Sequence, residues 1–362
     1  MKKKLLLSLL LCAAVLSSGC GNEKTQEPET TATVISTETE HYSGYMLKYK
    51  DKIISKEYYE YMLSITKYDF LDMYTNYANE YAKRGLDFGM AYFGTEIADT
   101  EEFWSARMTD DGKTVTVADI VKSQTLTFAK CVSVFDSIMK EHGLTFSDST
   151  KEKAESSLKT RTGDNAESVL SRFGVTGDEA LYAELVSAGL DEIRDEVCKE
   201  GGAAEITGEM TDAELAKSVR YKAISYYGEK EATEKKAKKS YDRIISGETS
   251  FDDEIKKSDD FGELTGEYAD GTVLSKEEFC ELFGLESDSR TFSAGDIFLA
   301  SNDNGSYVIR IEDRTEADRE NAFSTIKSSV FTEFLKTYTS NIEIDEKAVE
   351  RIDFFMIART AP

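Results

Sequence analysis

The sequence is poor in proline, histidine and cysteine, and each shortage excludes a particular kind of folding step or chemical site. Only two of the 362 residues are proline, Pro28 and Pro362. The body of the chain between them contains none, so its folding cannot be limited by isomerisation of its own prolyl bonds. The two histidines are His41 and His142, and the five cysteines have no CxxC or zinc-site spacing. No phosphate-binding loop or Ser/His/Asp arrangement is readable either. The sequence therefore predicts no metal site and no cofactor.

Basic residues are also scarce. The chain has 44 Lys and Arg against 69 Asp and Glu, a net charge of −25. Without Lys2, Lys3 and Lys4 at its start, 41 basic residues remain against 69 acidic ones, which gives −28. This excess of negative charge argues against binding to nucleic acid or anionic lipid as a main role. It suits a soluble body that is held away from an anionic surface.

A single apolar run lies at the start of the chain. Residues 5–16, LLLSLLLCAAVL, follow the three lysines and are too few for a comfortable membrane span. The run ends in SSGC and resembles a bacterial lipoprotein signal, which is cut before the cysteine, here Cys20. Ser17 departs from that pattern, because leucine is usual three residues before the cysteine. The alternative is an ordinary secretory signal that is cut nearby.

The resemblance to a lipoprotein signal implies acylation of Cys20. Acyl chains anchor a protein to a membrane without spanning it. Residues 1–19 are then a signal peptide, and residues 20–43 are the lipidated cysteine and a polar tether rich in Thr and Glu. We expect the protein on the extracytoplasmic face of the bacterial cell membrane.

Residues 44–209 are predicted to form a mainly helical module. A short β-unit with a turn at 50–52 precedes Ser55, which is placed to cap a long helix. Residues 86–114 indicate a connection with one short helix. Thr116 and Asp119 form a capping-box pattern before a second long helix, and Gly143 fits its end. Aromatic residues recur at helical spacing along the first helix: Phe70, Tyr74, Tyr77 and Tyr81.

Residues 210–315 are predicted to form a small α+β domain. Thr211 and Glu214 form a capping box, and strand 219–228 is followed by helices at 233–247 and 250–258. Residues 261–275 indicate a loop, and residues 275–284 a further helix. The stretch 297–314 predicts a β-hairpin with half-buried strands, turned by Asn304 and Gly305 at positive φ. Residues 316–362 then supply a long helix, a strand and a short helix.

Three stretches resemble the PrsA/SurA-type extracytoplasmic foldases, whose central domain is a parvulin-type peptidyl-prolyl isomerase. VRYKAISY at 219–226 is similar to the first parvulin strand. YDRIISGETSFDDEIKKSDDFGEL at 241–264 is similar to two parvulin helices and a following GGDLG-like turn. GSYVIRIEDR at 305–314 looks like the last strand. The resemblance covers about residues 43–350. It implies an α+β fold, in which a mainly helical chaperone module like the SurA N-terminal domain carries an inserted parvulin-like domain.

The chemistry departs from that family. Parvulins place two histidines on adjacent central strands, and here Ala223 and Tyr307 occupy those positions. Asp260, with Asp259 and Glu263, either stands in for the family's acidic residue or belongs to a solvated loop. Prolyl isomerisation needs no covalent catalyst, so a shaped apolar pocket could still lower its barrier of about 18–20 kcal/mol.

The resemblance therefore gives a set of pocket candidates rather than a catalytic residue. Phe279 and Phe283 either line such a pocket or are ordinary core aromatics, and Cys280 suits packing in the same helix. We expect no catalytic role for His142, which ends a helix beside Gly143. The pocket candidates are Ala223, Asp260, Phe261, Phe279, Phe283 and Tyr307.

The function indicated is a membrane-anchored chaperone or foldase that binds unfolded secreted polypeptides. One alternative is an active peptidyl-prolyl isomerase with a substituted site, so the enzymatic assignment stays open. The others are a solute-binding lipoprotein and a non-catalytic interaction module of the cell envelope. No nucleic-acid partner is expected, and a homodimer is left open.

Overall fold

The computed structural model describes residues 44–110, 113–259, 271–286 and 291–360. The chain folds into two compact units. Of the described residues, those at 44–205 and 328–360 belong to the first unit and those within 206–327 to the second. The α+β class is confirmed, since helices predominate and the described residues form three small antiparallel sheets. Within the described ranges, no helix has the length and apolar character needed to cross a membrane.

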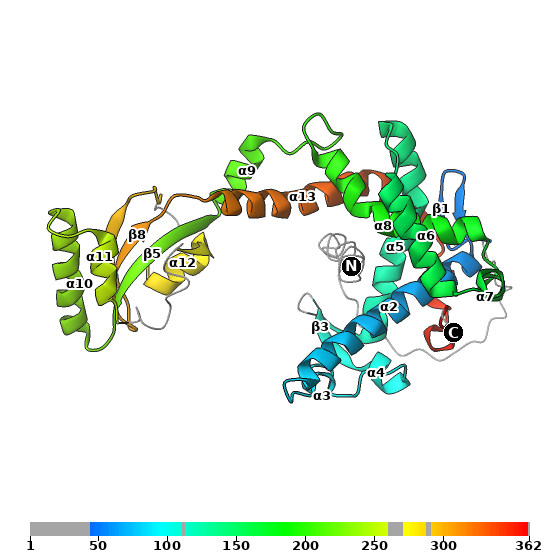
Figure 1. Cartoon of the computed structure of the whole chain (residues 1–362), viewed down its shortest axis with the longest axis horizontal. Helices are drawn as coiled ribbons and strands as arrows, with labels where there is room; N and C mark the ends of the chain where they lie inside the picture. The colour runs from blue at the N-terminus through cyan, green and yellow to red at the C-terminus, as the bar shows by residue number, and fades with distance from the viewer. Residues whose placement is uncertain (1–43, 111–112, 260–270, 287–290, 361–362) are drawn as a thin grey trace, which may run out of the picture. The chain divides into compact units, whose positions relative to one another are not determined.

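The first unit is built around three helices of 22 to 27 residues (Figure 1). Their bounds follow from capping residues, since the Ser55 side chain accepts from Tyr58 N and the Thr116–Asp119 box is formed. Gly143 ends the second long helix with a φ of 63°. The elements are β1 (Leu47–Tyr49), β2 (Lys52–Ile54), α2 (Lys56–Ala82), α3 (Phe88–Tyr92), α4 (Glu101–Ser105), β3 (Arg107–Asp110), β4 (Lys113–Thr116), α5 (Val117–His142), α6 (Asp148–Thr162), α7 (Ala166–Phe173) and α8 (Gly177–Cys198).

The connection after α2 holds more structure than the sequence indicates. It contains two short helices, α3 and α4, where one was expected, and then the hairpin β3–β4. The hairpin was missed because its strands are short and polar, and Asp110 pairs with Lys113 across its turn. The α3 helix has an equally local cause, since the Asp87 side chain accepts from Met90 N at 3.0 Å.

A buried charged cluster ties three helices of the first unit together. Arg161 of α6 forms two bonds of 2.6 Å to the Asp69 carboxylate of α2, and its Nε donates to Glu184 of α8 at 2.7 Å. The Glu184 side chain is 2% exposed. Burial raises the pKa of Glu184, while the guanidinium of Arg161 opposes that rise. Helices distant in the sequence are thus held at one set of orientations.

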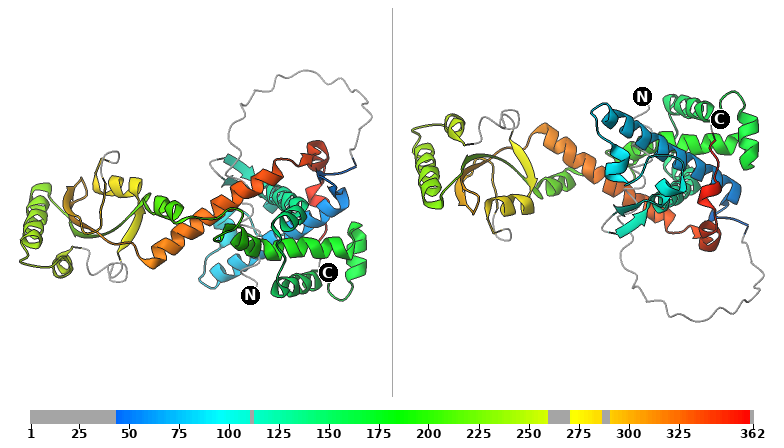
Figure 2. Two further views of the ribbon diagram at one scale, coloured as in Figure 1. Left: turned by 90° about the horizontal axis from the view of Figure 1, so that it is seen from above. Right: turned by 90° about the horizontal axis from the view of Figure 1, so that it is seen from below.

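The end of the chain returns to the first unit. After α13 (Glu316–Thr339) come β9 (Glu343–Ile344), α14 (Glu346–Glu350) and the 3-10 turn η2 (Phe354–Met356). Strand β9 pairs with β1 in the sheet order β2-β1-β9. Both views in Figure 2 show the red C-terminal segment beside the blue N-terminal strands. The first unit therefore needs both ends of the described chain.

Lys67 of α2 fixes this returning segment. Its side chain is 1% exposed, and its Nζ lies 3.2 Å from Asp99 and 3.4 Å from the carbonyl oxygens of Phe354 and Ile357. The same Nζ lies 5.0 Å from the ring of Phe354 and 5.5 Å from that of Trp104. A buried ammonium group requires such partners, so α2 and the last residues are coupled through one charge.

The second unit is a four-stranded antiparallel sheet with helices on both faces (Figure 1). The strand order is β6-β5-β8-β7, and the hairpin β7–β8 is confirmed by its register. The elements are α9 (Gly208–Leu215), β5 (Ser218–Tyr226), α10 (Lys230–Ile245), α11 (Phe251–Glu254), η1 (Ile255–Lys257), β6 (Thr272–Ser275), α12 (Lys276–Phe283), β7 (Ile297–Ser301) and β8 (Ser306–Ile311).

The expectation of half-buried hairpin strands is wrong for β8. Tyr307 and Ile309 pack on the α12 face, whereas Val308, with no exposure, packs on the other face with Ile224, Ala237 and other residues. The cause is tertiary, because α10 covers the second face of the sheet. Two layers of helices thus bury a central strand on both sides.

Three local expectations in the second unit are corrected. Residues 272–275 are strand β6 rather than loop, since they pair with β5. Helix α9 is capped by Thr207, whose side chain accepts from Met210 N, instead of Thr211. Neither Asn304 nor Gly305 has positive φ. The Asn302 side chain instead accepts from both of their amides, and a Cβ on Gly305 would lie 2.6 Å from Tyr226 O.

Replacing Lys67 should destabilise the first unit. We expect Lys67→Met to lower the free energy of unfolding by about 2–4 kcal/mol, because Asp99 and two carbonyl groups lose a charged partner. Denaturant unfolding followed by fluorescence of Trp104, the one tryptophan in the sequence, measures it. The control is Lys83→Met at the end of the same helix, where the side chain is 68% exposed and a change within about 0.5 kcal/mol is expected. Equal effects of the two variants would contradict the role given to Lys67.

The Asp99 carboxylate should make the first unit sensitive to acid. Burial raises its pKa, but hydrogen bonds from Tyr68 and Trp104, together with Lys67, hold the pKa below its ordinary value. A carboxyl group with a lowered folded-state pKa stabilises the fold above its unfolded pKa, and this is lost as pH falls through the folded pKa. The stability difference between the wild type and Asp99→Asn should therefore be constant above about pH 5 and shrink below about pH 4. A difference that is independent of pH down to about pH 2 would refute this assignment.

Candidate functional site

The two residues that the sequence resemblance assigned to the parvulin histidine positions lie on adjacent central strands of the second unit. Ala223 is on β5 and Tyr307 on β8, and the register pairs Ala223 with Ile309 and Ser225 with Tyr307. Both side chains belong to the apolar cluster on the α12 face. The sheet thus brings together two residues that are 84 positions apart in the sequence (307 − 223).

Helix α12 covers these two positions with aromatic rings. Phe283 lies 5.0 Å from Tyr307 and 5.2 Å from Tyr221, and Phe279 lies 5.1 Å from Phe283. These are edge-to-face contacts at the spacing that aromatic rings prefer. Exposed fractions are 0% for Phe279, 3% for Phe283, 5% for Tyr307 and 7% for Ala223. The four candidates therefore belong to one packed apolar cluster.

The polar groups near this cluster serve the local fold. The Tyr307 hydroxyl donates to Asn302 Oδ1 at 3.5 Å, and Asn302 Nδ2 donates to the Leu282 carbonyl at 2.7 Å. Asp259 accepts from Tyr227 N at 2.8 Å, and its own amide donates to Ser225 O at 2.9 Å. Asp259 thus fastens the end of β5. Asp260, Phe261 and Glu263 lie outside the described residues, as does Cys20.

Cys280 and His142 make contacts that are typical of structural residues. Cys280 is 2% exposed and belongs to the same apolar cluster as Phe279. His142 ends α5, and its Nε2 lies 2.9 Å from the Tyr338 hydroxyl, which donates to Glu141 at 3.0 Å. With its two histidines at positions 41 and 142, the chain has no imidazole in the second unit. Acid–base chemistry at the cluster would have no histidine to use.

A different surface, in the first unit, presents apolar groups to solvent. Among the residues that the structure describes, 13 large apolar side chains are exposed, and five of them lie within residues 77–92. Rings meet around Phe88, whose centroid is 4.9 Å from that of Tyr81, 5.3 Å from Tyr92 and 6.2 Å from Tyr77. Figure 1 shows α3 beside the end of α2. We call this set the aromatic surface; it consists of Tyr77, Tyr81, Leu86, Phe88, Met90 and Tyr92, with exposed fractions of 40–56% for all but Phe88.

The base of the aromatic surface is a set of packed aromatic rings. Phe70 is 4% exposed and packs on Tyr74 at 4.6 Å, and Tyr74 contacts Phe93 at 5.0 Å. Phe93 in turn contacts Phe103 of α4 at 5.1 Å. Of the four aromatic residues that recur along α2, Phe70 therefore belongs to the core, whereas Tyr77 and Tyr81 are exposed. Exposed aromatic rings on a fixed base can bind apolar segments with little loss of side-chain entropy.

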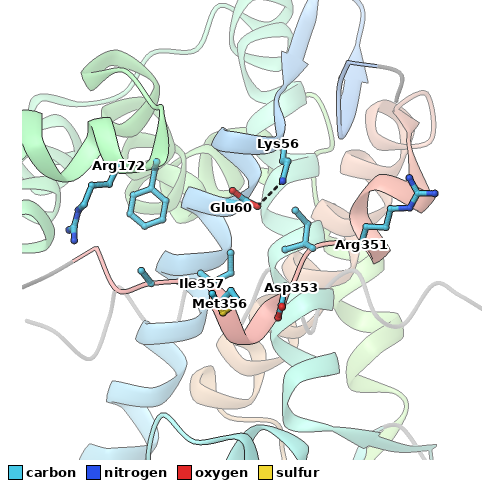
Figure 3. Close-up of a pocket in the computed structure, with 10 residues that line it drawn as sticks. Lys56, Glu60, Arg172, Arg351, Asp353, Met356 and Ile357 are labelled. Atoms are coloured by element: carbon cyan, nitrogen blue, oxygen red, sulfur yellow. Dashed lines mark ion pairs between the residues drawn. The ribbon is translucent and has the colours of Figure 1, made fainter. Parts of the chain in front are cut away.

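A cavity of about 310 Å³ lies where the C-terminal segment passes α2 and α7. In Figure 3 the Lys56–Glu60 ion pair forms one wall, and Met356 and Ile357 lie at the opposite side. The guanidinium groups of Arg172 and Arg351 point away from the centre. The lining residues are Lys56, Glu60, Arg172, Phe173, Arg351, Ile352, Asp353, Met356, Ile357 and Ala358. None of the residues predicted from the sequence lines it.

Comparison with known proteins gives distant likenesses only. No family model and no curated protein matches the sequence. A PrsA peptidylprolyl isomerase from Bacillus cereus is 17% identical, with a TM-score of 0.29 over 69% of this chain and 93% of that one. Foldase protein PrsA from Streptococcus pneumoniae is 17% identical, with a TM-score of 0.25 over 69% and 96%. PrsA from Bacillus subtilis is 16% identical, with a TM-score of 0.22 over 67% and 89%.

The sequence pattern indicated only two of the six residues of the aromatic surface. Tyr77 and Tyr81 stood out by helical spacing, but Leu86, Phe88, Met90 and Tyr92 did not. They occupy the five-residue helix α3 and its approach, which is too short to show a periodic pattern. The usable signal was the density of apolar residues in LDFGMAYFG (86–94), next to a helix already rich in tyrosine.

Removing the Phe283 ring tests whether the cluster is core or an open cleft. Because the ring is fully enclosed, we expect Phe283→Ala to destabilise the second unit by about 3–5 kcal/mol. Hydrogen exchange of the β5 and β8 amides reports on that unit alone. The control, Leu282→Ala, removes a neighbour that is 44% exposed and should change stability by less than about 1 kcal/mol. A loss below about 1 kcal/mol for Phe283→Ala would mean that the ring borders an open pocket.

Proposed function

We propose that this protein is an extracytoplasmic chaperone or foldase, anchored to the membrane through acylated Cys20, that binds unfolded secreted polypeptides. The observation that carries the proposal is the aromatic surface. Its three tyrosine rings contact the ring of Phe88, lie above a packed aromatic base and are 40–55% exposed. Apolar clusters of this kind on a soluble body usually mark binding surfaces.

The second unit supports a parvulin-like assignment without its usual catalytic pair. The positions that resemble the family's histidines, Ala223 and Tyr307, lie on adjacent central strands, as the resemblance requires. The space in front of them is filled by Phe279 and Phe283. The domain then acts as a scaffold or as an accessory binding surface, and its isomerase activity is absent or low.

The alternative of a solute-binding lipoprotein is less well supported. Such proteins use two lobes with alternating strands and helices. The first unit instead consists of long helices joined by short sheets, and the second is a single sheet with antiparallel strands. An interaction module without client activity is the outcome if the experiments below fail.

Substituting the aromatic surface should weaken client binding. We expect the double variant Tyr77→Ser/Met90→Ser to reduce suppression of aggregation of an unfolded secreted client, with an affinity loss of about tenfold, since two contacts that become buried on binding are removed. Light scattering at equal molar ratio measures it. The matched control is Ile53→Ser/Ile245→Ser, which removes apolar side chains of similar exposure, 51% and 57%, from other surfaces.

The outcome that contradicts this proposal is equal suppression by the two double variants and the wild type, or no suppression by any of them. Refolding of a proline-limited client separates the two kinds of activity. We expect a higher yield and an unchanged slow phase, because the β5–β8 cluster is filled. A faster slow phase at substoichiometric protein would instead establish the alternative of an active isomerase with a substituted site.

A further inference from the structure

The aromatic surface is bordered by acidic residues. Residues 72–102 contain seven Asp and Glu against two basic residues, Lys83 and Arg84. Three of the acidic side chains are neutralised by ion pairs: Asp72 with Arg359, Glu80 with Lys83 and Asp99 with Lys67. Outside these ion pairs, this stretch retains four acidic residues and one basic residue, Arg84. We call these four the acidic rim: Asp87, Glu96, Glu101 and Glu102, for which the described residues show no ion pair.

The rim lies directly beside the aromatic surface. Asp87 begins α3, where its carboxylate caps the helix. The 95–97 loop packs on the same helix so closely that a Cβ on Gly89 would lie 2.8 Å from Thr95 O. Glu101 and Glu102 are in the first turn of α4, the helix whose Phe103 contacts Phe93. Figure 1 shows α3 and α4 at the same end of the first unit.

Two features of this surface favour the same kind of ligand. Exposed carboxylates attract cations, and their summed field extends over roughly 8 Å at physiological salt. The faces of tyrosine rings also attract ammonium and guanidinium groups. Tyr77, Tyr81 and Tyr92 present such rings within the patch. A segment with Lys or Arg beside aromatic or aliphatic residues satisfies both features, whereas an acidic segment of equal apolarity is repelled.

The same charges disfavour the two occupants that this protein itself could supply. The tether at 21–43 carries Glu23, Glu27, Glu29, Glu38 and Glu40 against the single Lys24. A second copy of the chain would bring an identical acidic rim to the contact, since a two-fold interface joins like patches. Binding of the tether or of a second copy would therefore bring acidic residues against the acidic rim.

We propose that the aromatic surface selects non-native polypeptide segments in which aromatic or aliphatic residues lie beside lysine or arginine. This selection rests on the chaperone function proposed above. Equally apolar segments with glutamate or aspartate are discriminated against. The protein thus chooses among unfolded clients by charge as well as by apolarity.

Three fluorescent peptides of about 12 residues test this selection. They share the same Tyr, Leu and Ser positions and differ only in about four positions that are all Lys, all Gln or all Glu. Fluorescence anisotropy with the chain 21–362 gives their affinities at about 20 mM and about 500 mM salt. We expect the Lys peptide to bind at least about tenfold more tightly than the Glu peptide at low salt, with the Gln peptide between them. At high salt the difference should fall to about twofold, since the charges are then screened.

Rim variants separate the local charges from the net charge of the whole chain. Glu96→Gln/Glu101→Gln/Glu102→Gln should reduce the Lys-to-Glu difference to about threefold or less and leave the affinity for the Gln peptide unchanged. The control is Glu152→Gln/Glu155→Gln/Glu167→Gln, which removes the same number of exposed charges from α6 and α7 and should preserve the difference. Thermal unfolding checks that both variants fold.

The outcomes distinguish this inference from the function on which it rests. If all three peptides bind equally, or if the α6 and α7 control abolishes the difference as fully as the rim variant, charge selection by the rim is refuted. In that case binding of apolar segments still stands. If none of the peptides binds the wild type at millimolar concentration, the proposed chaperone function fails and the selection fails with it.

Discussion

The first unit depends on one buried charge. Lys67 carries an ammonium group into the interior of α2, and its partners come from the connection after α2 and from the last residues of the chain. An uncompensated charge in such a place is costly, so α2 is stable where it lies only when the C-terminal segment is in place. This requirement joins the two ends of the described chain into one unit, and the second unit is an insertion between them.

The second unit meets a comparable requirement with a buried ion pair. Arg220 of β5 and Asp318 at the start of α13 have side chains that are 8% and 9% exposed, and they lie 2.9 Å apart. Arg314 donates to the carbonyl oxygens of Leu215 and Ser218, so the residues that leave the sheet are tied to those that enter it. The inserted chain thus begins and ends at one place. A domain whose two ends are held together can be carried by another unit without disturbing it.

Aromatic residues form both the buried cluster of the second unit and the exposed aromatic surface of the first. Phe279 and Phe283 are enclosed between α12 and the sheet, where their rings fill the space in front of Ala223 and Tyr307. Tyr77 and Tyr81 lie beside α3, which is too short to cover them, and Tyr92 is the last residue of that helix, so the three rings remain exposed. The proposed client surface therefore arises because α3 is short. The proposed loss of catalysis arises because α12 packs tightly on the sheet.

The sequence by itself determined the long helices, their caps at Ser55 and Thr116, the hairpin β7–β8 and the α+β class, because each follows from periodicity and local hydrogen bonding. That Ala223 and Tyr307 occupy the histidine positions of a parvulin-like sheet stays a prediction from the resemblance, and the structure places these two residues on adjacent strands. Tertiary structure alone decided the rest. Strand β6 exists because β5 is there to pair with, and β8 is buried on both faces because α10 covers one of them. Whether an aromatic ring is core or surface depends on the element that covers it, and in this chain that element lies far away in the sequence or is too short to be recognised.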